Sequence, residues 1–218
     1  MSGRAPLIYT LRDFFTVNAG APLTTPRACE PGPGTLAITD TANIISTSGG
    51  QLVVNGATSG SNTGLIQNDA VARQAGRASS FFFGSITASG LGRVGLHTSL
   101  ASGMTYRLDI GTITLNVIDN FTGHAVSFVP PQTLTIVERA TGAFCIFGTT
   151  LVWVWHTSTA AAKPTLWFAS GQNPNMLLAS LKVAAIPEMD ADSKMYASFS
   201  AAPASGDTTT MEANAIIE

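Results

Sequence analysis

Acidic side chains come first among the residues that could do chemistry, because retaining glycosidases of jelly-roll shape hold two carboxyl groups about 5 Å apart. Asp109 and Asp119 fall on separate apolar runs of this chain, and Glu138 has no acidic neighbour on its run. No Gly-x-Ser-x-Gly nucleophile elbow is present either. The sequence therefore predicts no catalytic residue and no enzyme.

Histidines and glycines do not predict a metal or nucleotide site. His97, His124 and His156 are widely separated, whereas zinc sites use closely spaced ligands, so histidines at strand ends are the favoured interpretation. The string Gly90-Leu-Gly-Arg-Val-Gly95 matches a dinucleotide fingerprint by letter. That site needs a helix directly after the glycines, and the residues here continue as a strand. No cofactor is expected.

Oxygen ligands for a divalent cation are sparse. Asp190 and Asp192 form one small group, and Asp40, Asn68 and Asp69 could form another. Calcium takes about six or more oxygen ligands, and no loop of the chain is that rich in acids. Solvated turns are the favoured interpretation, so no metal site is predicted.

Three tryptophans are the candidates for carbohydrate contact. Trp153 and Trp155 share one face of a predicted strand, and Trp167 lies on a later strand. Exposed rings in such an arrangement can stack on a sugar. The alternative is that the rings fill a core, because a buried aromatic removes about 150–250 Å² from water. This alternative is favoured.

These residues are positioned by short runs of β-branched and aromatic residues, a pattern typical of consecutive antiparallel strands. Within 133–139, Leu134 and Ile136 share one face, whereas 151–156 is almost continuously apolar and is predicted to be covered on both sides. Gly49-Gly50 predicts a hairpin, because glycine accepts positive φ. The fold is predicted to be all-β, an antiparallel two-sheet jelly-roll sandwich of about a dozen strands.

The composition changes after Pro187. Residues 1–187 are predicted to form the sandwich, and residues 188–218 an extended C-terminal arm of small and polar residues. Such an arm has few neighbours of its own and is ordered mainly by a partner. Its apolar side chains are the candidates for partner contact: Tyr196, Phe199, Ile216 and Ile217.

Charged residues make up only 11% of the 218 residues, against about 25% in typical soluble domains. A surface of small polar residues is easily desolvated, which favours permanent contacts in an assembly. A β protein with many Thr- and Gly-rich turns would look similar. The lysines and arginines are scattered, so nucleic-acid binding is not predicted. No apolar run approaches the roughly 20 residues of a membrane span.

The two cysteines, Cys29 and Cys145, are too few for a disulfide framework, and reduced thiols are favoured over a single bridge. The residues after Met1 lack the apolar core of a signal peptide. Synthesis in a cytoplasm is the simpler account.

Two parts of the chain resemble a known family. Thr39-Asp-Thr41 and Ser48-Gly-Gly-Gln-Leu-Val53 follow a variable loop after Asp13-Phe-Phe15. The later part runs, in order, Leu134-Thr-Ile136, Gly142-Ala-Phe144, Ile146-Phe-Gly148, Leu151-Val-Trp153, Leu178-Ala-Ser-Leu-Lys-Val183 and Ile186-Pro187. This order is similar to that of concanavalin A/laminin-G-like jelly-roll domains of tailed-phage structural proteins.

The resemblance implies a two-sheet jelly roll located in a virion, with no particular chemistry. We therefore expect a non-enzymatic virion structural protein, either a capsid decoration (cement) protein or a minor capsid protein, that stabilises the particle through loop and arm contacts. Expected partners are further copies of the chain, for example in a trimer, and the major capsid protein or tail proteins. The alternatives are a phage tail component or a glycan-binding module for host attachment. The chain departs from the family pattern at Cys145 and Thr149, where an aromatic and a second glycine are expected.

Overall fold

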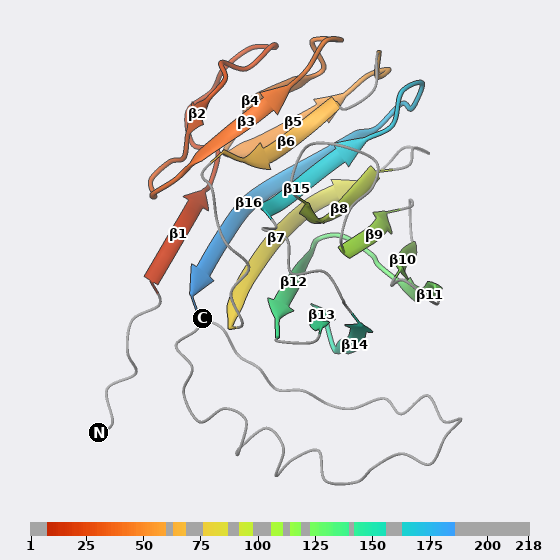
Figure 1. Cartoon of the computed structure of the whole chain (residues 1–218). Helices are drawn as coiled ribbons and strands as arrows, with labels where there is room; N and C mark the ends of the chain where they lie inside the picture. The colour runs from red at the N-terminus through yellow and green to blue at the C-terminus, as the bar shows by residue number, and fades with distance from the viewer. Residues whose placement is uncertain are drawn as a thin grey trace, which may run out of the picture.

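The computed structural model describes residues 8–59, 63–68, 76–86, 92–97, 106–110, 114–118, 123–139, 142–155 and 163–185. All regular elements in these ranges are strands, and they form two antiparallel sheets (Figure 1). The prediction of an all-β sandwich is confirmed. None of the described residues belongs to a helix that could cross a membrane by its length and apolarity.

The first sheet, sheet A, contains the first and the last described strands of the chain. Its order is β14 (Thr150–Trp155), β13 (Gly142–Phe147), β12 (Gln132–Glu138), β7 (Arg77–Ile86), β16 (Asn175–Ala185), β5 (Gln51–Asn55) and β4 (Ile45–Ser48), with β1 (Ile8–Asp13) also paired to β16.

The second sheet, sheet B, is built mostly from the middle of the chain. Its order is β11 (Gly123–Ser127), β10 (Thr114–Ile118), β9 (Tyr106–Ile110), β8 (Gly92–His97), β15 (Lys163–Phe168), β6 (Thr63–Gln67), β3 (Thr35–Thr39) and β2 (Arg27–Ala28).

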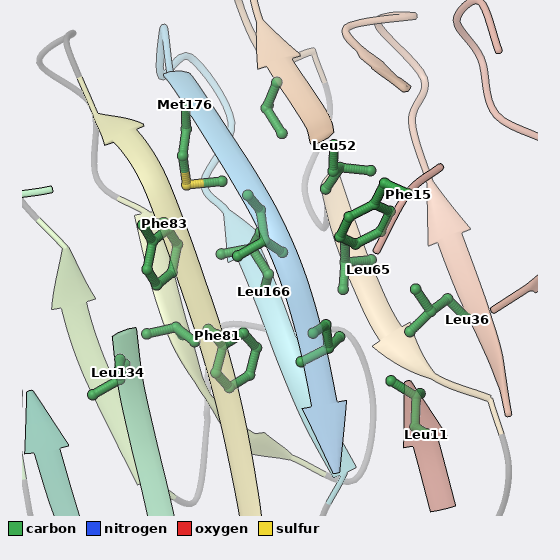
Figure 2. Packing of buried hydrophobic residues seen from close by; sticks show 14 of the residues in the cluster. Leu11, Phe15, Leu36, Leu52, Leu65, Phe81, Phe83, Leu134, Leu166 and Met176 are labelled. Atoms are coloured by element: carbon green, nitrogen blue, oxygen red, sulfur yellow. The ribbon is translucent and has the colours of Figure 1, made fainter. Parts of the chain in front are cut away.

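The core lies between the two sheets and is apolar. Figure 2 shows side chains of both sheets in one cluster, with Phe81 and Leu134 from sheet A and Leu65 and Leu166 from sheet B. These four side chains are fully buried. Burying each contributes about 1.5–3 kcal/mol relative to leaving it exposed. The alternating apolar residues of the strands thus find partners only when one sheet lies on the other.

Alternation along β12 follows the sequence prediction. Leu134 and Ile136 belong to the core cluster, whereas Val137 is buried but does not belong to it. Val137 therefore lies on the outer face of sheet A, by which we mean the face turned away from sheet B.

The turn between β4 and β5 is the predicted hairpin. Gly49 and Gly50 both have positive φ, 59° and 72°, as a two-residue type I′ turn requires. The predicted domain boundary at Pro187 and the arm after it lie outside the described part of the chain and stay predictions.

Candidate functional site

The outer face of sheet B carries an aromatic residue between polar ones. On β15, Leu166 and Phe168 belong to the core cluster. Because side chains alternate along a strand, Lys163, Thr165 and Trp167 face the other way. Trp167 is buried without belonging to the core cluster, in agreement with this assignment.

A row of four positions crosses this face from strand to strand. Trp167 on β15 pairs with Arg93 on β8. Arg93 pairs with Asp109 on β9, and Asp109 pairs with Asn116 on β10. Residues paired in this way share one face of a sheet. With about 4.8 Å between strands, the row spans about 14 Å, which is the length of a short oligosaccharide.

Within this row, Arg93 and Trp167 form a cation–π contact. The guanidinium carbon of Arg93 lies 4.7 Å from the centroid of the Trp167 ring, and Trp167 is only 4% exposed. The ring therefore supports the guanidinium and does not itself offer an open stacking surface. A guanidinium carries five N–H donors, and Arg93 is half-buried at its position in this row.

A second aromatic group lies on the outer face of sheet A. Trp153 on β14 pairs with Phe144 on β13, and their ring centroids are 4.6 Å apart at an interplanar angle of 61°. The Arg139 guanidinium lies 5.9 Å from the Phe144 ring. The register places Trp155 opposite Gly142, two residues along from Trp153 and so on the same face.

The three candidate tryptophans therefore divide between two sheets and do not form one site. Trp153 is half-buried on an outer face and is not part of the core, so the favoured interpretation that it fills the core is wrong. The expected covering of this strand on both sides is also wrong at Leu151, Val152 and Trp153, because each is half-buried and β14 lies at the sheet edge. Stacking on a glycan by these rings stays a prediction.

Carboxylates are distributed unevenly between the sheets. Asp109 is the one acidic residue in the described strands of sheet B. In sheet A, Glu138 is fully buried and ion-paired with Arg77. Asp13 is also fully buried and is ion-paired with Arg27. Asp119 lies outside the described residues.

No group of three or more metal-ligating side chains occurs among the described residues. His97 and His124 belong to β8 and β11, which are separated in sheet B by two strands. The Asp40 carboxylate makes hydrogen bonds within its own turn. Its two oxygens accept from the backbone N–H groups of Ile44 and Ile45, at 3.0 and 2.7 Å. The other proposed cation ligands, Asp69, Asp190 and Asp192, lie outside the described part, as does His156.

The glycine string and the cysteines have structural roles. Gly92 and Gly95 of the string lie in β8, which continues through His97, so they do not open a helix, and Gly90 lies outside the described residues. Cys29 and Cys145 are both buried free thiols, as predicted. Burial raises the pKa of the Cys145 thiol from an ordinary 9.0 to about 12, so Cys145 is not a nucleophile at neutral pH.

Sequence comparison gives no relative, since no protein-family model and no curated protein match the chain. Solved structures do match. A non-specific endo-beta-1,3(4)-glucanase of family GH16, SCLam, has a TM-score of 0.56 at 8% identity, covering 85% of this chain and 94% of that one. An endo-acting O-glycanase of the human gut microbiota has 0.53 at 8%, covering 82% and 99%. A putative beta-glucanase of Mycobacterium abscessus has 0.50 at 13%, covering 81% and 100%.

These likenesses show a concanavalin-like jelly-roll fold. They contradict the prediction of a non-enzymatic virion structural protein, because the similar structures are named as enzymes that act on glycans. The expectation that the protein is not an enzyme is contradicted by the same finding. The capsid and cement functions receive no support, and the glycan-binding alternative fits better. At these identities the likeness shows the fold and not the reaction.

Sequence analysis missed Arg93 and Asn116. The alternation in Gly92-Arg-Val-Gly-Leu-His97 does place the Arg93 and Val94 side chains on opposite faces of their strand. The pairing of β8 with both β15 and β9, which brings Trp167 and Asp109 to either side of Arg93, has no signal in the sequence.

Proposed function

We propose that the protein is carbohydrate-active and binds a glycan along the positions Arg93, Asp109 and Asn116, with the Trp167 ring supporting Arg93. The observation that carries this proposal is the register of four adjacent strands, which brings the positions Trp167, Arg93, Asp109 and Asn116 into one line. Sugars are recognised by such a combination, because their hydroxyl groups both donate and accept hydrogen bonds. The names of the similar structures support a glycan over other ligands.

The first experiment is binding of the full chain to a glycan array, followed by titration calorimetry with the best ligand. β-1,3(4)-Glucan oligosaccharides are included because a similar structure is named for them. Arg93→Ala removes the donors of the row, and losing a charged hydrogen bond of about 1.5–3 kcal/mol weakens binding roughly 10- to 150-fold. Asn116→Ala should weaken it as well.

Trp153→Ala is the matched control, because it removes an aromatic from the outer face of the other sheet. Binding that survives Trp153→Ala but not Arg93→Ala supports the proposed row. The reverse result would move the site to sheet A, and a chain that binds no glycan would refute the proposal.

Release of new reducing ends is measured in the same samples. A two-carboxylate hydrolysis needs an acid and a nucleophile or base. Asp109 is the residue of the row that could supply one of them, and the second would come from outside the described strands of sheet B. Asp109→Asn should abolish any hydrolysis while leaving glycan binding measurable.

The remaining expectations stay predictions: a viral origin, a location in the virion, and assembly into a homo-oligomer such as a trimer. So does a role of Tyr196, Phe199, Ile216 and Ile217 in partner contact.

A further inference from the structure

Two cations lie next to each other on the outer face of sheet A. Arg12 on β1 and Lys182 on β16 are cross-strand partners. Lys182 stands between two residues of the core cluster, Leu181 and Val183, and Arg12 follows a third, Leu11. Because side chains alternate along a strand, both cations point away from sheet B. Both are half-buried, so part of each side chain reaches the surface.

Aromatic rings hold these cations in place without neutralising them. The Lys182 ammonium lies 5.0 Å from the centroid of the Phe14 ring. The guanidinium carbon of Arg12 lies 5.9 Å from the same ring and 5.4 Å from the Tyr9 ring. Among the described residues, neither cation forms an ion pair, and the buried Arg12 Nε has no hydrogen-bond partner. Like charges directly opposite each other on two strands repel, so this pair is stabilised by an anion.

The described acidic residues of sheet A do not balance the two charges. Its described strands contain two carboxylates, Asp13 and Glu138. Both are fully buried and ion-paired with other arginines, Arg27 and Arg77. The outer face around Arg12 is therefore positive and attracts negatively charged ligands.

Hydroxyl groups continue the row beyond Lys182. Lys182 pairs with Ser80 on β7, and Ser80 pairs with Thr135 on β12. The Ser80 and Thr135 hydroxyl oxygens lie 2.9 Å apart, so one donates to the other. A hydroxyl donates one hydrogen bond and accepts two, and the half-buried Ser80 thus keeps capacity for a ligand.

An exposed aromatic ring lies beside this row. Phe82 is two residues from Ser80 on β7 and therefore on the same face. It is 37% exposed, whereas its neighbours Phe81 and Phe83 are fully buried in the core. Its cross-strand partner on β12, Thr133, is exposed as well. An open ring flanked by a few polar groups is typical of small-ligand sites.

We call Arg12, Lys182, Ser80, Phe82 and Thr133 the sheet A patch. Its strands β1, β16, β7 and β12 lie side by side (Figure 1). At about 4.8 Å between strands, the patch is about 14 Å wide, enough for two or three sugar units. It combines two positive charges, hydroxyl groups and an open ring.

We propose that the sheet A patch binds an acidic glycan, a chain of sugars that carries carboxylate or sulfate groups. Lys182 and Arg12 bind the oxyanion, Ser80 and Thr133 bind sugar hydroxyls, and Phe82 stacks on the apolar face of a sugar ring. This site is separate from the row through Arg93, which lies on sheet B, and does not depend on it.

Titration calorimetry of the full chain with matched pairs of probes tests this proposal. One pair is trigalacturonic acid and its neutral methyl ester, and the other is a sulfated galactan oligosaccharide and its desulfated form. We expect at least one acidic probe to bind, and its neutral counterpart to bind at least about tenfold more weakly. The pair that shows this difference identifies the oxyanion. A chain that binds neither acidic probe, or binds both no better than their neutral counterparts, would overturn the proposal.

Charge variants locate the binding. Lys182→Gln and Arg12→Gln should each weaken binding of the acidic probe about tenfold or more, whereas Lys163→Gln, which removes a cation from sheet B, should not. Melting temperatures report the folding of each variant, and they should not fall for Lys182→Gln because the repulsion between the two cations is removed. Should the charge variants not fold, Phe82→Ala leaves both cations in place and should weaken binding as well. Unchanged affinity in the folded variants would refute the site.

Arg93→Ala separates this site from the row on sheet B. Acidic-probe binding that survives Arg93→Ala but not Lys182→Gln supports the sheet A patch, even if no neutral glycan binds the chain. Binding that survives Lys182→Gln but not Arg93→Ala would place the acidic glycan on sheet B, and the proposal would then be wrong.

Discussion

The Arg77 side chain donates from Nε to the Glu138 carboxylate inside the sandwich, where the two side chains are 2% and 0% exposed. Arg77 begins β7 and Glu138 ends β12, so the pair joins two neighbouring strands of sheet A on the core side. A buried ion pair carries a desolvation cost that its attraction only partly repays.

Replacing one partner should therefore be far more harmful than replacing both. We expect Glu138→Gln to lower the free energy of unfolding by about 3–5 kcal/mol, because it leaves the guanidinium buried without its counter-charge. Combining Arg77→Met with Glu138→Leu should recover most of that loss. Urea unfolding of the two variants checks this, and a double variant less stable than the single one would contradict it.

Cys145 should make the fold sensitive to alkali. Its pKa is about 12 in the folded chain, because burial disfavours the thiolate, and an unfolded thiol titrates near 9.0. Between these values the folded state holds a proton that the unfolded state has lost. Stability thus falls as pH rises through this window, by about 1.4 kcal/mol per pH unit.

The comparison is made with Cys145→Ala, which lacks the titration but keeps Cys29. Unfolding free energies measured from pH 8 to pH 10.5 should fall more steeply for the parent chain than for Cys145→Ala. Parallel slopes would show that this thiol does not titrate as its burial requires.

Gly64 on β6 is the cross-strand partner of Trp167 on β15. Its φ is 149°, and a Cβ atom at this position would lie 2.1 Å from the Leu166 carbonyl oxygen. That oxygen is backbone and has little freedom to move, so Gly64→Ala should cost more than about 1 kcal/mol of unfolding free energy. Gly20→Ala is the control, since nothing lies within 4 Å of a Cβ there and its φ is ordinary. Thermal unfolding of both variants gives the answer, and equal melting temperatures would disprove the steric argument.

Asp13 fixes the start of the loop between β1 and β2. One carboxylate oxygen accepts hydrogen bonds from the N–H groups of Phe15 and Glu30, at 2.8 and 3.3 Å, and the other accepts from Arg27 Nε at 3.1 Å. Asp13→Asn keeps the shape but removes the charge facing Arg27. We expect a loss of about 1–3 kcal/mol and faster hydrogen exchange at the Phe15 amide. Glu30→Gln should have a smaller effect because Glu30 is partly exposed. Slow exchange in Asp13→Asn would argue against the carboxylate as the anchor.

Local patterns predicted the local parts of this fold. Paired glycines at 49 and 50 indicated a turn because only glycine readily takes positive φ twice in succession. Alternation in β12 indicated which residues enter the core. Strand β2 has two residues and β11 begins Gly-His-Ala, so neither carries an apolar pattern that a sequence window could detect.

Much less of the candidate site than of the fold could be predicted from the sequence. Alternation shows that Trp153 and Trp155 share a face, but it does not show which face is buried, and the apolar run hid the fact that β14 is an edge strand. The row through Arg93 depends on pairing between residues that are far apart in the sequence, for example Trp167 with Arg93, which are 74 residues apart. Such register is set by the packing of the whole sandwich and has no local signal.

Strand β16 has a consequence for how the protein is made. It pairs with β7, β5 and β1, yet it is the last of the described strands to be synthesised. While the ribosome is still translating residues 175–185, those three earlier strands expose unpaired edges to other nascent chains. Sheet A is therefore completed only after β16 has been synthesised, and low expression temperature or a chaperone that shields strand edges should raise the yield of native protein.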